Sequence, residues 1–86
     1  MPEISRFFGI IIRMYVNEHG VPHFHAYYQG NDVSIEIETG AVLEGSLSPR
    51  ALRLVREWLE MHRDELLENW NIAMARGIFK RIKPLE

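Results

Sequence analysis

The stretch that decides the fold is HFHAYYQGNDVSIEIE, which runs from His23 to Glu38. Apolar and polar residues alternate on both sides of its central turn, as they do in half-buried strands. A two-residue turn at Gly30-Asn31 gives the apolar pairs Phe24–Ile37, Ala26–Ile35 and Tyr28–Val33, and the polar pairs His23–Glu38, His25–Glu36 and Tyr27–Ser34. We therefore expect an antiparallel hairpin with one apolar and one polar face.

Further strands are predicted on both sides of this hairpin. Residues 7–16 are β-branched and aromatic and read as the first strand, and residues 42–47 read as a short fourth strand after a loop at 39–41. In this arrangement Glu44 lies opposite Glu36, while Leu43 and Leu47 join the apolar face.

The second half of the chain is predicted to be helical. Ser48-Pro49 is a strong helix start, apolar residues then recur every three or four positions, and Gly77 marks a stop. One helix over residues 49–76 would be about 42 Å long, which favours a bend near His62-Arg63-Asp64. Residues 79–85 suit a short extra strand or an extended segment on the core.

The predicted fold is α+β in one domain spanning residues 1–86. A three- to four-stranded antiparallel β-meander (residues 1–47) is followed by a long or broken helical segment (48–77) that packs on one sheet face, and by an extended tail (78–86). Side chains on the opposite sheet face form a polar patch, which consists of Arg13, Tyr15, His23, His25, Tyr27, Ser34, Glu36, Glu38 and Glu44.

Composition narrows the class of protein. The 86 residues are 47% hydrophobic and 26% charged, which is typical of a globular protein and excludes a disordered chain. There are no cysteines, so disulfides, thiolate metal sites and cysteine nucleophiles are excluded. The net charge of −2 is unevenly distributed along the chain, because residues 1–46 carry −4 and residues 47–86 carry +2. No targeting or membrane-spanning segment is visible, so we expect a cytoplasmic protein.

His23 and His25 form the sharpest local motif. Histidines at i and i+2 on a strand point the same way and can hold one divalent transition metal, such as zinc or nickel. Glu36 and Glu38 could complete such a site or orient the rings, and His19 in the preceding turn is a candidate third nitrogen ligand. The alternative is a solvated polar face with cross-strand His–Glu pairs.

The same face offers groups for catalysis. Glu36 opposite Glu44, with His25 beside them, could act as a general acid/base set. A metal-assisted hydrolase or RNase would use His23, His25, Glu36 and Glu38, with Arg13 holding a phosphate. The alternative is that the carboxylates simply extend into water.

Cations gather in the helical half and the tail. Arg50, Arg53 and Arg56 form a stripe at a spacing of three, and Lys80, Arg81 and Lys83 form a second group. Together they could bind nucleic acid. The alternative is a solvated helix face with Arg53–Glu57 and Arg56–Glu60 pairs.

The residues taken together resemble a bacterial family, Domain of Unknown Function 4160. The resemblance rests on Ser5-Arg6-Phe7-Phe8-Gly9, His19, Pro22-His23-Phe24-His25-Ala26, Glu38-Thr39-Gly40, Glu57-Trp58, His62-Arg63 and Asn69-Trp70. Val21 departs from it, because the family often has a second proline there.

This resemblance implies a small bacterial protein with no established activity. Members are often encoded beside a protein of the Domain of Unknown Function 2442 family, which implies a small partner protein in a toxin–antitoxin-like or regulatory gene pair. We therefore expect an interaction and binding module, with the hydrolase and the nucleic-acid binder as alternatives. A homo-oligomer is compatible with the sequence, and the edges of so short a sheet invite another chain.

Overall fold

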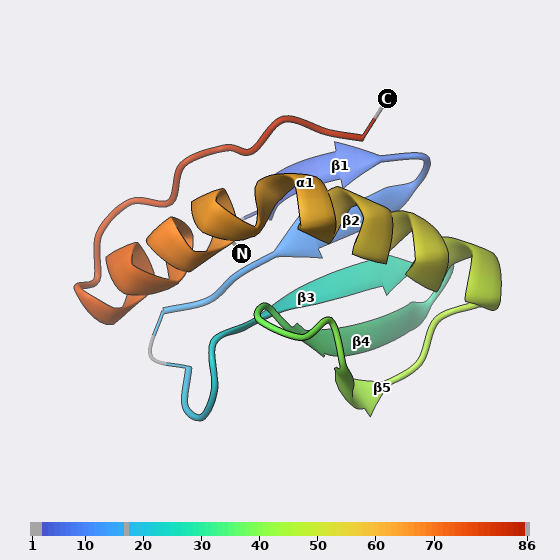
Figure 1. Cartoon of the computed structure of the whole chain (residues 1–86), viewed down its shortest axis with the longest axis horizontal. Helices are drawn as coiled ribbons and strands as arrows, with labels where there is room; N and C mark the ends of the chain where they lie inside the picture. The colour runs from blue at the N-terminus through green and yellow to red at the C-terminus, as the bar shows by residue number, and fades with distance from the viewer. Residues whose placement is uncertain (1–2, 17, 86) are drawn as a thin grey trace.

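An antiparallel sheet of five strands and one long helix make up the fold, as seen in a computed structural model that describes residues 3–16 and 18–85 (Figure 1). The elements are β1 (Glu3–Phe7), β2 (Ile10–Arg13), β3 (His23–Tyr28), β4 (Asn31–Glu36), β5 (Val42–Gly45) and α1 (Pro49–Met74). The strands lie side by side in chain order, which confirms the predicted α+β meander with one strand more than expected.

The extra strand arises because the predicted first strand is interrupted by a turn. Phe8 and Gly9 have φ angles of 51° and 80° and connect β1 to β2, where Phe7 pairs with Ile10. Positive φ at both turn positions matches the twist of a tight hairpin. The prediction of one strand over residues 7–16 was wrong, because Gly9 inside an apolar run marks this turn.

The central hairpin has the predicted faces but a different register. The turn is Gln29-Gly30, with φ angles of 49° and 84°, rather than Gly30-Asn31. His23 therefore pairs with Glu36 and His25 with Ser34, two positions away from the predicted pairing. A shift of two residues keeps every side chain on its face, so face matching alone could not detect it.

The last strand also differs from the prediction. Glu44 pairs with Ser34, so Glu44 and Glu36 do not face each other as expected. β5 ends at Gly45, Leu43 is 46% exposed instead of joining the apolar face, and Leu47 packs against the core. A register irregularity between Ser34 and Ile35 displaces Leu43 from the regular alternation.

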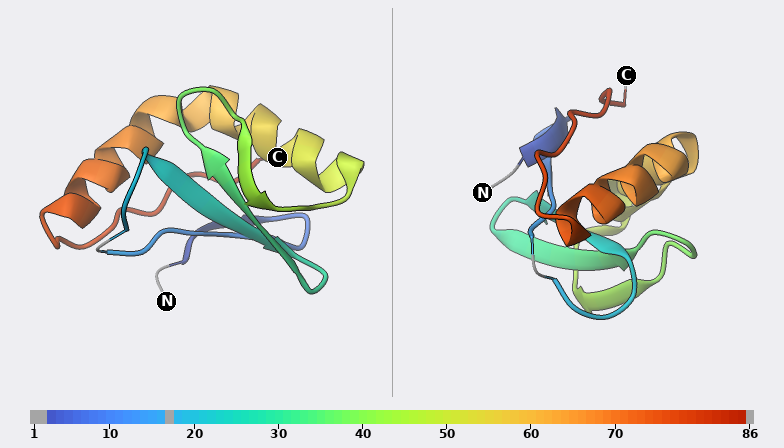
Figure 2. Two further views of the ribbon diagram at one scale, coloured as in Figure 1. Left: turned by 90° about the horizontal axis from the view of Figure 1, so that it is seen from below. Right: turned by 90° about the vertical axis from the view of Figure 1, so that its left-hand side faces the viewer.

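The helix begins and bends where the sequence indicates. The Ser48 hydroxyl accepts a hydrogen bond from the Ala51 amide at 3.2 Å, and the backbone kinks at His62, where φ is −130°. The helix therefore arches over the sheet (Figure 2). It ends at Met74, two residues before the predicted end, and a left-handed Arg76 lets the Gly77 amide bond to the Ile72 carbonyl. In the described ranges, no helix combines the length and hydropathy needed to cross a membrane.

The core lies between α1 and the inner sheet face, and the tail closes it. Trp58, Phe24 and Ile35 are fully buried between the two layers. The tail runs as an extended segment beside β1 (Figure 1), where the Ile82 amide donates to the Ile4 carbonyl. The predicted extended segment is thus present.

Candidate metal centre

The two histidines of the motif stand side by side at the start of β3. The strand places His23 and His25 on one face, as the period of two requires, and their ring centroids are 5.2 Å apart. His23 is 9% exposed and packs against the indole of Trp70 on α1, while His25 packs against the ring of Tyr15. Both imidazoles are therefore held by aromatic neighbours rather than free in solvent.

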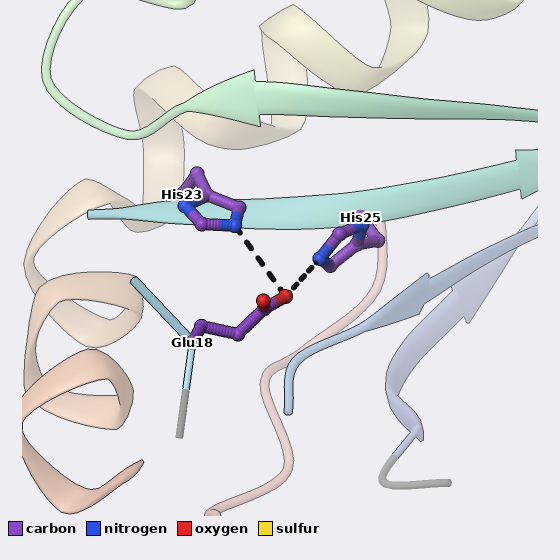
Figure 3. Close-up of side chains that lie close together, drawn as sticks. All are labelled: Glu18, His23 and His25. Atoms are coloured by element: carbon purple, nitrogen blue, oxygen red, sulfur yellow. Dashed lines mark hydrogen bonds and ion pairs between the residues drawn. The ribbon is translucent and has the colours of Figure 1, made fainter. Parts of the chain in front are cut away.

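A third ligand-type side chain reaches them from the loop between β2 and β3. The Glu18 carboxylate points at both rings (Figure 3), with Oε1 3.4 Å from His23 Nε2 and in hydrogen-bond contact with His25 Nε2. One donor atom from each residue lies within 4.8 Å of the other two. Two imidazoles and one carboxylate therefore converge on a single point.

The far nitrogen of each ring is engaged outside the cluster. His23 Nδ1 lies 2.7 Å from the Val21 carbonyl oxygen, and His25 Nδ1 lies 3.3 Å from the Ser34 hydroxyl. A carbonyl oxygen can only accept, so His23 Nδ1 carries a proton and donates it there. Each Nε2 atom then faces Glu18, which is the arrangement found where a histidine ligates a metal and is oriented by an outer partner.

Opposing influences act on the Glu18 carboxyl. Its partial burial by itself raises the pKa, but the hydrogen bond with His25 and the charges of both histidines outweigh burial and lower the pKa below its ordinary value. The ionised carboxylate, which is the metal-ligating form, is therefore the favoured one.

The cluster forms one wall of an open hollow of about 540 Å³. The loop residues Glu18 to Val21 line it on one side, and Leu43 and Glu44 of β5 line it on the other. A neighbouring hollow of about 280 Å³, lined by Tyr15 and Asp32, shares His25, Ser34 and Glu44 with it. A group bound by the cluster would therefore remain accessible from outside.

Residues 9–71 match the family model described as Domain of unknown function (DUF4160). The chain belongs to this family. The match covers β2 to β5, most of α1 and all three residues of the cluster, so the resemblance predicted from the sequence is confirmed. No curated protein and no solved structure matches the chain.

In this DUF4160 chain, the other predicted metal ligands lie outside the cluster. Glu36 pairs with His23 across the ladder, but its carboxylate accepts a hydrogen bond from the Thr39 hydroxyl at 2.8 Å. Glu38 is exposed in the turn after β4. His19 lines the hollow without being one of the three converging donors.

The predicted catalytic groups are also separated. With Glu44 paired to Ser34, the proposed Glu36–Glu44 acid/base set is not formed. Arg13 pairs with His25 across β2 and β3, but its guanidinium lies over the Tyr27 ring, 5.6 Å from the centroid. No Lys or Arg lines either hollow in the described part of the chain, so these hollows offer no cation for a phosphate.

Several predicted nucleic-acid contacts have partners within the protein. Arg56 donates to the Gly40 carbonyl oxygen at 2.9 Å. Lys80 pairs with Glu68 at 3.0 Å and Arg81 with Glu3 at 3.2 Å. Arg50, Arg53 and Lys83 are exposed. The basic residues thus serve in part to hold the loop before β5 and the tail.

Proposed function

We propose that this protein binds one divalent transition-metal ion through Glu18, His23 and His25. The observation that carries the proposal is the convergence of both Nε2 atoms on one carboxylate, with each Nδ1 engaged elsewhere. Imidazole and carboxylate together suit Zn²⁺, Ni²⁺ or Fe²⁺ rather than Mg²⁺ or Ca²⁺, which prefer oxygen ligands alone.

The spacing supports such an ion. Ligand atoms about 2.1 Å from a tetrahedral metal are about 3.4 Å from one another. His23 Nε2 and Glu18 Oε1 are 3.4 Å apart, so an ion fits between them once the Glu18 side chain rotates away from His25. Three protein ligands leave a further position for water or another group, and the open hollow gives access to it.

Metal titration by isothermal calorimetry tests the proposal. Wild-type protein should bind Zn²⁺ and Ni²⁺ at one ion per chain, and the His23→Ala/His25→Ala double variant should lose about a hundredfold or more in affinity. Glu18→Gln should weaken binding strongly, because it removes the ligating charge. Glu36→Gln is its matched control and should bind as the wild type does.

Circular dichroism of each variant separates lost ligands from lost folding. Equal weak affinities in the wild type and the double variant, with both folded, contradict the proposal. If Glu36→Gln lowers metal affinity as much as Glu18→Gln does, then Glu36, the carboxylate predicted from the sequence, is a metal ligand.

A second proposed function is an interaction module that pairs with a small partner protein, in a toxin–antitoxin-like or regulatory gene pair. The supporting observation is that the two sheet edges differ. The tail covers β1, whereas every residue of β5 is exposed. Co-expression with the neighbouring gene product and affinity purification test this function. Co-elution supports the pairing, and separate elution of two folded proteins counts against it.

A further inference from the structure

Among the described residues, the outer edge of β5 has no backbone partner. In residues 3–16 and 18–85, the backbone bonds of this strand run to β4, while the β1 edge receives a bond from Ile82 and the Arg81 guanidinium reaches the Glu3 carbonyl oxygen at 3.1 Å. Val42 is 38% exposed and Leu43 is 46% exposed. The strand therefore offers both an unpaired backbone and apolar side chains to another chain.

The surroundings of this edge are acidic. Glu44 on β5 and Asp32 on β4 line the same hollow, and neither has an ion-pair partner in the described ranges. Leu43 and Glu44 also form the β5 side of the hollow that holds the metal centre. A chain that lies along β5 would thus meet carboxylates on the face away from the helix and apolar contacts beside them.

This charge argues against a second copy of the chain as the occupant. Antiparallel pairing of two β5 strands would bring two Glu44 carboxylates close together on an edge already flanked by Asp32. Like charges across a strand pair are destabilising. The same carboxylates favour lysine or arginine side chains on an added strand.

We propose that β5 is the docking edge for an extended segment of a partner protein with alternating apolar and basic residues. This inference rests on the second proposed function, the interaction module, and adds the surface and the chemistry of the partner. The segment pairs with β5 as a sixth strand. Its basic side chains face Glu44 and Asp32, and its apolar side chains contact Leu43 and Val42.

A synthetic probe tests the surface without the natural partner. A fluorescein-labelled nonapeptide of alternating valine and lysine should bind the wild type, as followed by anisotropy, and should shift the backbone amide NMR signals of residues 42–45. The matched peptide with glutamate in place of lysine should not bind. Glu44→Lys should weaken binding of the lysine peptide about tenfold or more, because a rim charge is reversed.

Glu57→Lys is the control variant, because it makes the same charge change at an exposed site on α1. It should change peptide affinity by no more than about twofold. Equal losses in the two variants, or amide shifts away from β5, overturn the proposal. So does a concentration-dependent dimer in sedimentation velocity that Leu43→Asp abolishes, because a second copy is then the occupant.

Two further measurements distinguish a failure of this docking surface from a failure of the two proposed functions. Co-elution of the neighbouring gene product with both the wild type and Glu44→Lys would uphold the interaction module and overturn this choice of surface. Zinc binding by Glu44→Lys should be weakened far less than by Glu18→Gln, because Glu44 lines the same hollow but is not one of the three converging ligands. A loss as large as that in Glu18→Gln would make Glu44 a ligand of the metal centre and would overturn its role in the docking edge.

Discussion

The two imidazoles of the candidate metal centre differ in the group that faces their Nδ1 atom. His23 Nδ1 faces a backbone carbonyl oxygen at 2.7 Å, which accepts a hydrogen bond and never donates one. His25 Nδ1 faces the Ser34 hydroxyl at 3.3 Å, which can do either. In the ion-free protein the Glu18 carboxylate accepts from His25 Nε2, whereas a metal on Nε2 would require Nδ1 to carry the proton and donate it to Ser34, which makes Ser34 a positioning residue.

Ser34→Ala is expected to lower zinc affinity by about tenfold. This is the low end of the effect expected for an outer partner of a ligating histidine, because the contact between Ser34 and His25 is long. The ring ¹⁵N shifts of His25 should also change in the metal-free protein, which a merely structural role of Ser34 would not produce. Ser46→Ala, at an exposed position, should leave both readouts unaltered. Unchanged affinity together with unchanged His25 shifts would show that Ser34 does not orient the ring.

Part of this site could be predicted from single residues. Alternation along a strand places His23 and His25 together in any register. The carboxylate could not be found in the same way, because Glu18 lies in an irregular loop and no periodicity fixes where it points. Cross-strand reasoning favoured Glu36 and Glu38 instead. The sequence did offer one indication of Glu18. It lies only a few residues before His23, and a turn at Gly20 and Pro22 folds it back onto β3.

At the scale of the secondary-structure elements, the hydrophobic pattern predicts which face of the sheet each side chain occupies. The register of the paired strands depends instead on which two residues form the turn. Gln29 adopts a φ of 49°, which the residue type gives little reason to expect, while Gly30-Asn31 is the more familiar turn pair. The hydrophobic pattern therefore could not reveal a register shift of two residues between β3 and β4. The helix was easier to predict, because Ser48-Pro49 fixes its start and the apolar stripe fixes its buried face.

The helix and the tail are joined by one buried side chain, Asn69. Its amide nitrogen donates to the Lys80 carbonyl oxygen at 2.9 Å, and its amide oxygen accepts from the Lys80 backbone amide at 3.0 Å. Asn69→Ala should lower the free energy of unfolding by about 1–3 kcal/mol, because two backbone groups lose their partner. Asn71→Ala, at an exposed helix position, is the control and should be neutral or slightly stabilising. Urea denaturation measures both, and equal effects would contradict the role of Asn69.

At the scale of the whole molecule, opposite charges hold the two ends of the described chain together. The Glu3 carboxylate on β1 lies 2.7 Å from the Arg6 guanidinium and 3.2 Å from that of Arg81 in the tail. The hydrogen bond from Arg6 is the main influence that lowers the pKa of Glu3; burial opposes it and Arg81 adds to it. The edge strand and the tail that covers it are thus linked by an ionised carboxylate.

This arrangement predicts how stability depends on pH. A carboxyl whose pKa is lower in the folded state stabilises the fold above its unfolded pKa, and that contribution is lost as pH falls through the folded pKa. The difference in unfolding free energy between the wild type and Glu3→Gln should therefore shrink on acidification. Carboxyl ¹³C titration should show the Glu3 pKa rising more in Arg6→Gln than in Arg81→Gln. The reverse order would mean that the tail dominates.

Metal binding at the centre should stabilise the whole fold, because Glu18 lies in the loop after β2 while both histidines lie on β3. An ion bound only by the folded chain adds about 2.7 kcal/mol at a hundred times its dissociation constant. For a domain of this size that corresponds to a rise in Tm of about 10–20 °C. Differential scanning calorimetry with zinc should show this rise in the wild type and in Glu36→Gln, and a chelator should reverse it. Glu18→Gln and the His23→Ala/His25→Ala variant should lose most of it. An equal rise in all four proteins would place the bound zinc elsewhere, and no rise in the wild type would mean that the preformed cluster does not prefer an ion over the ion-free hydrogen-bonded state.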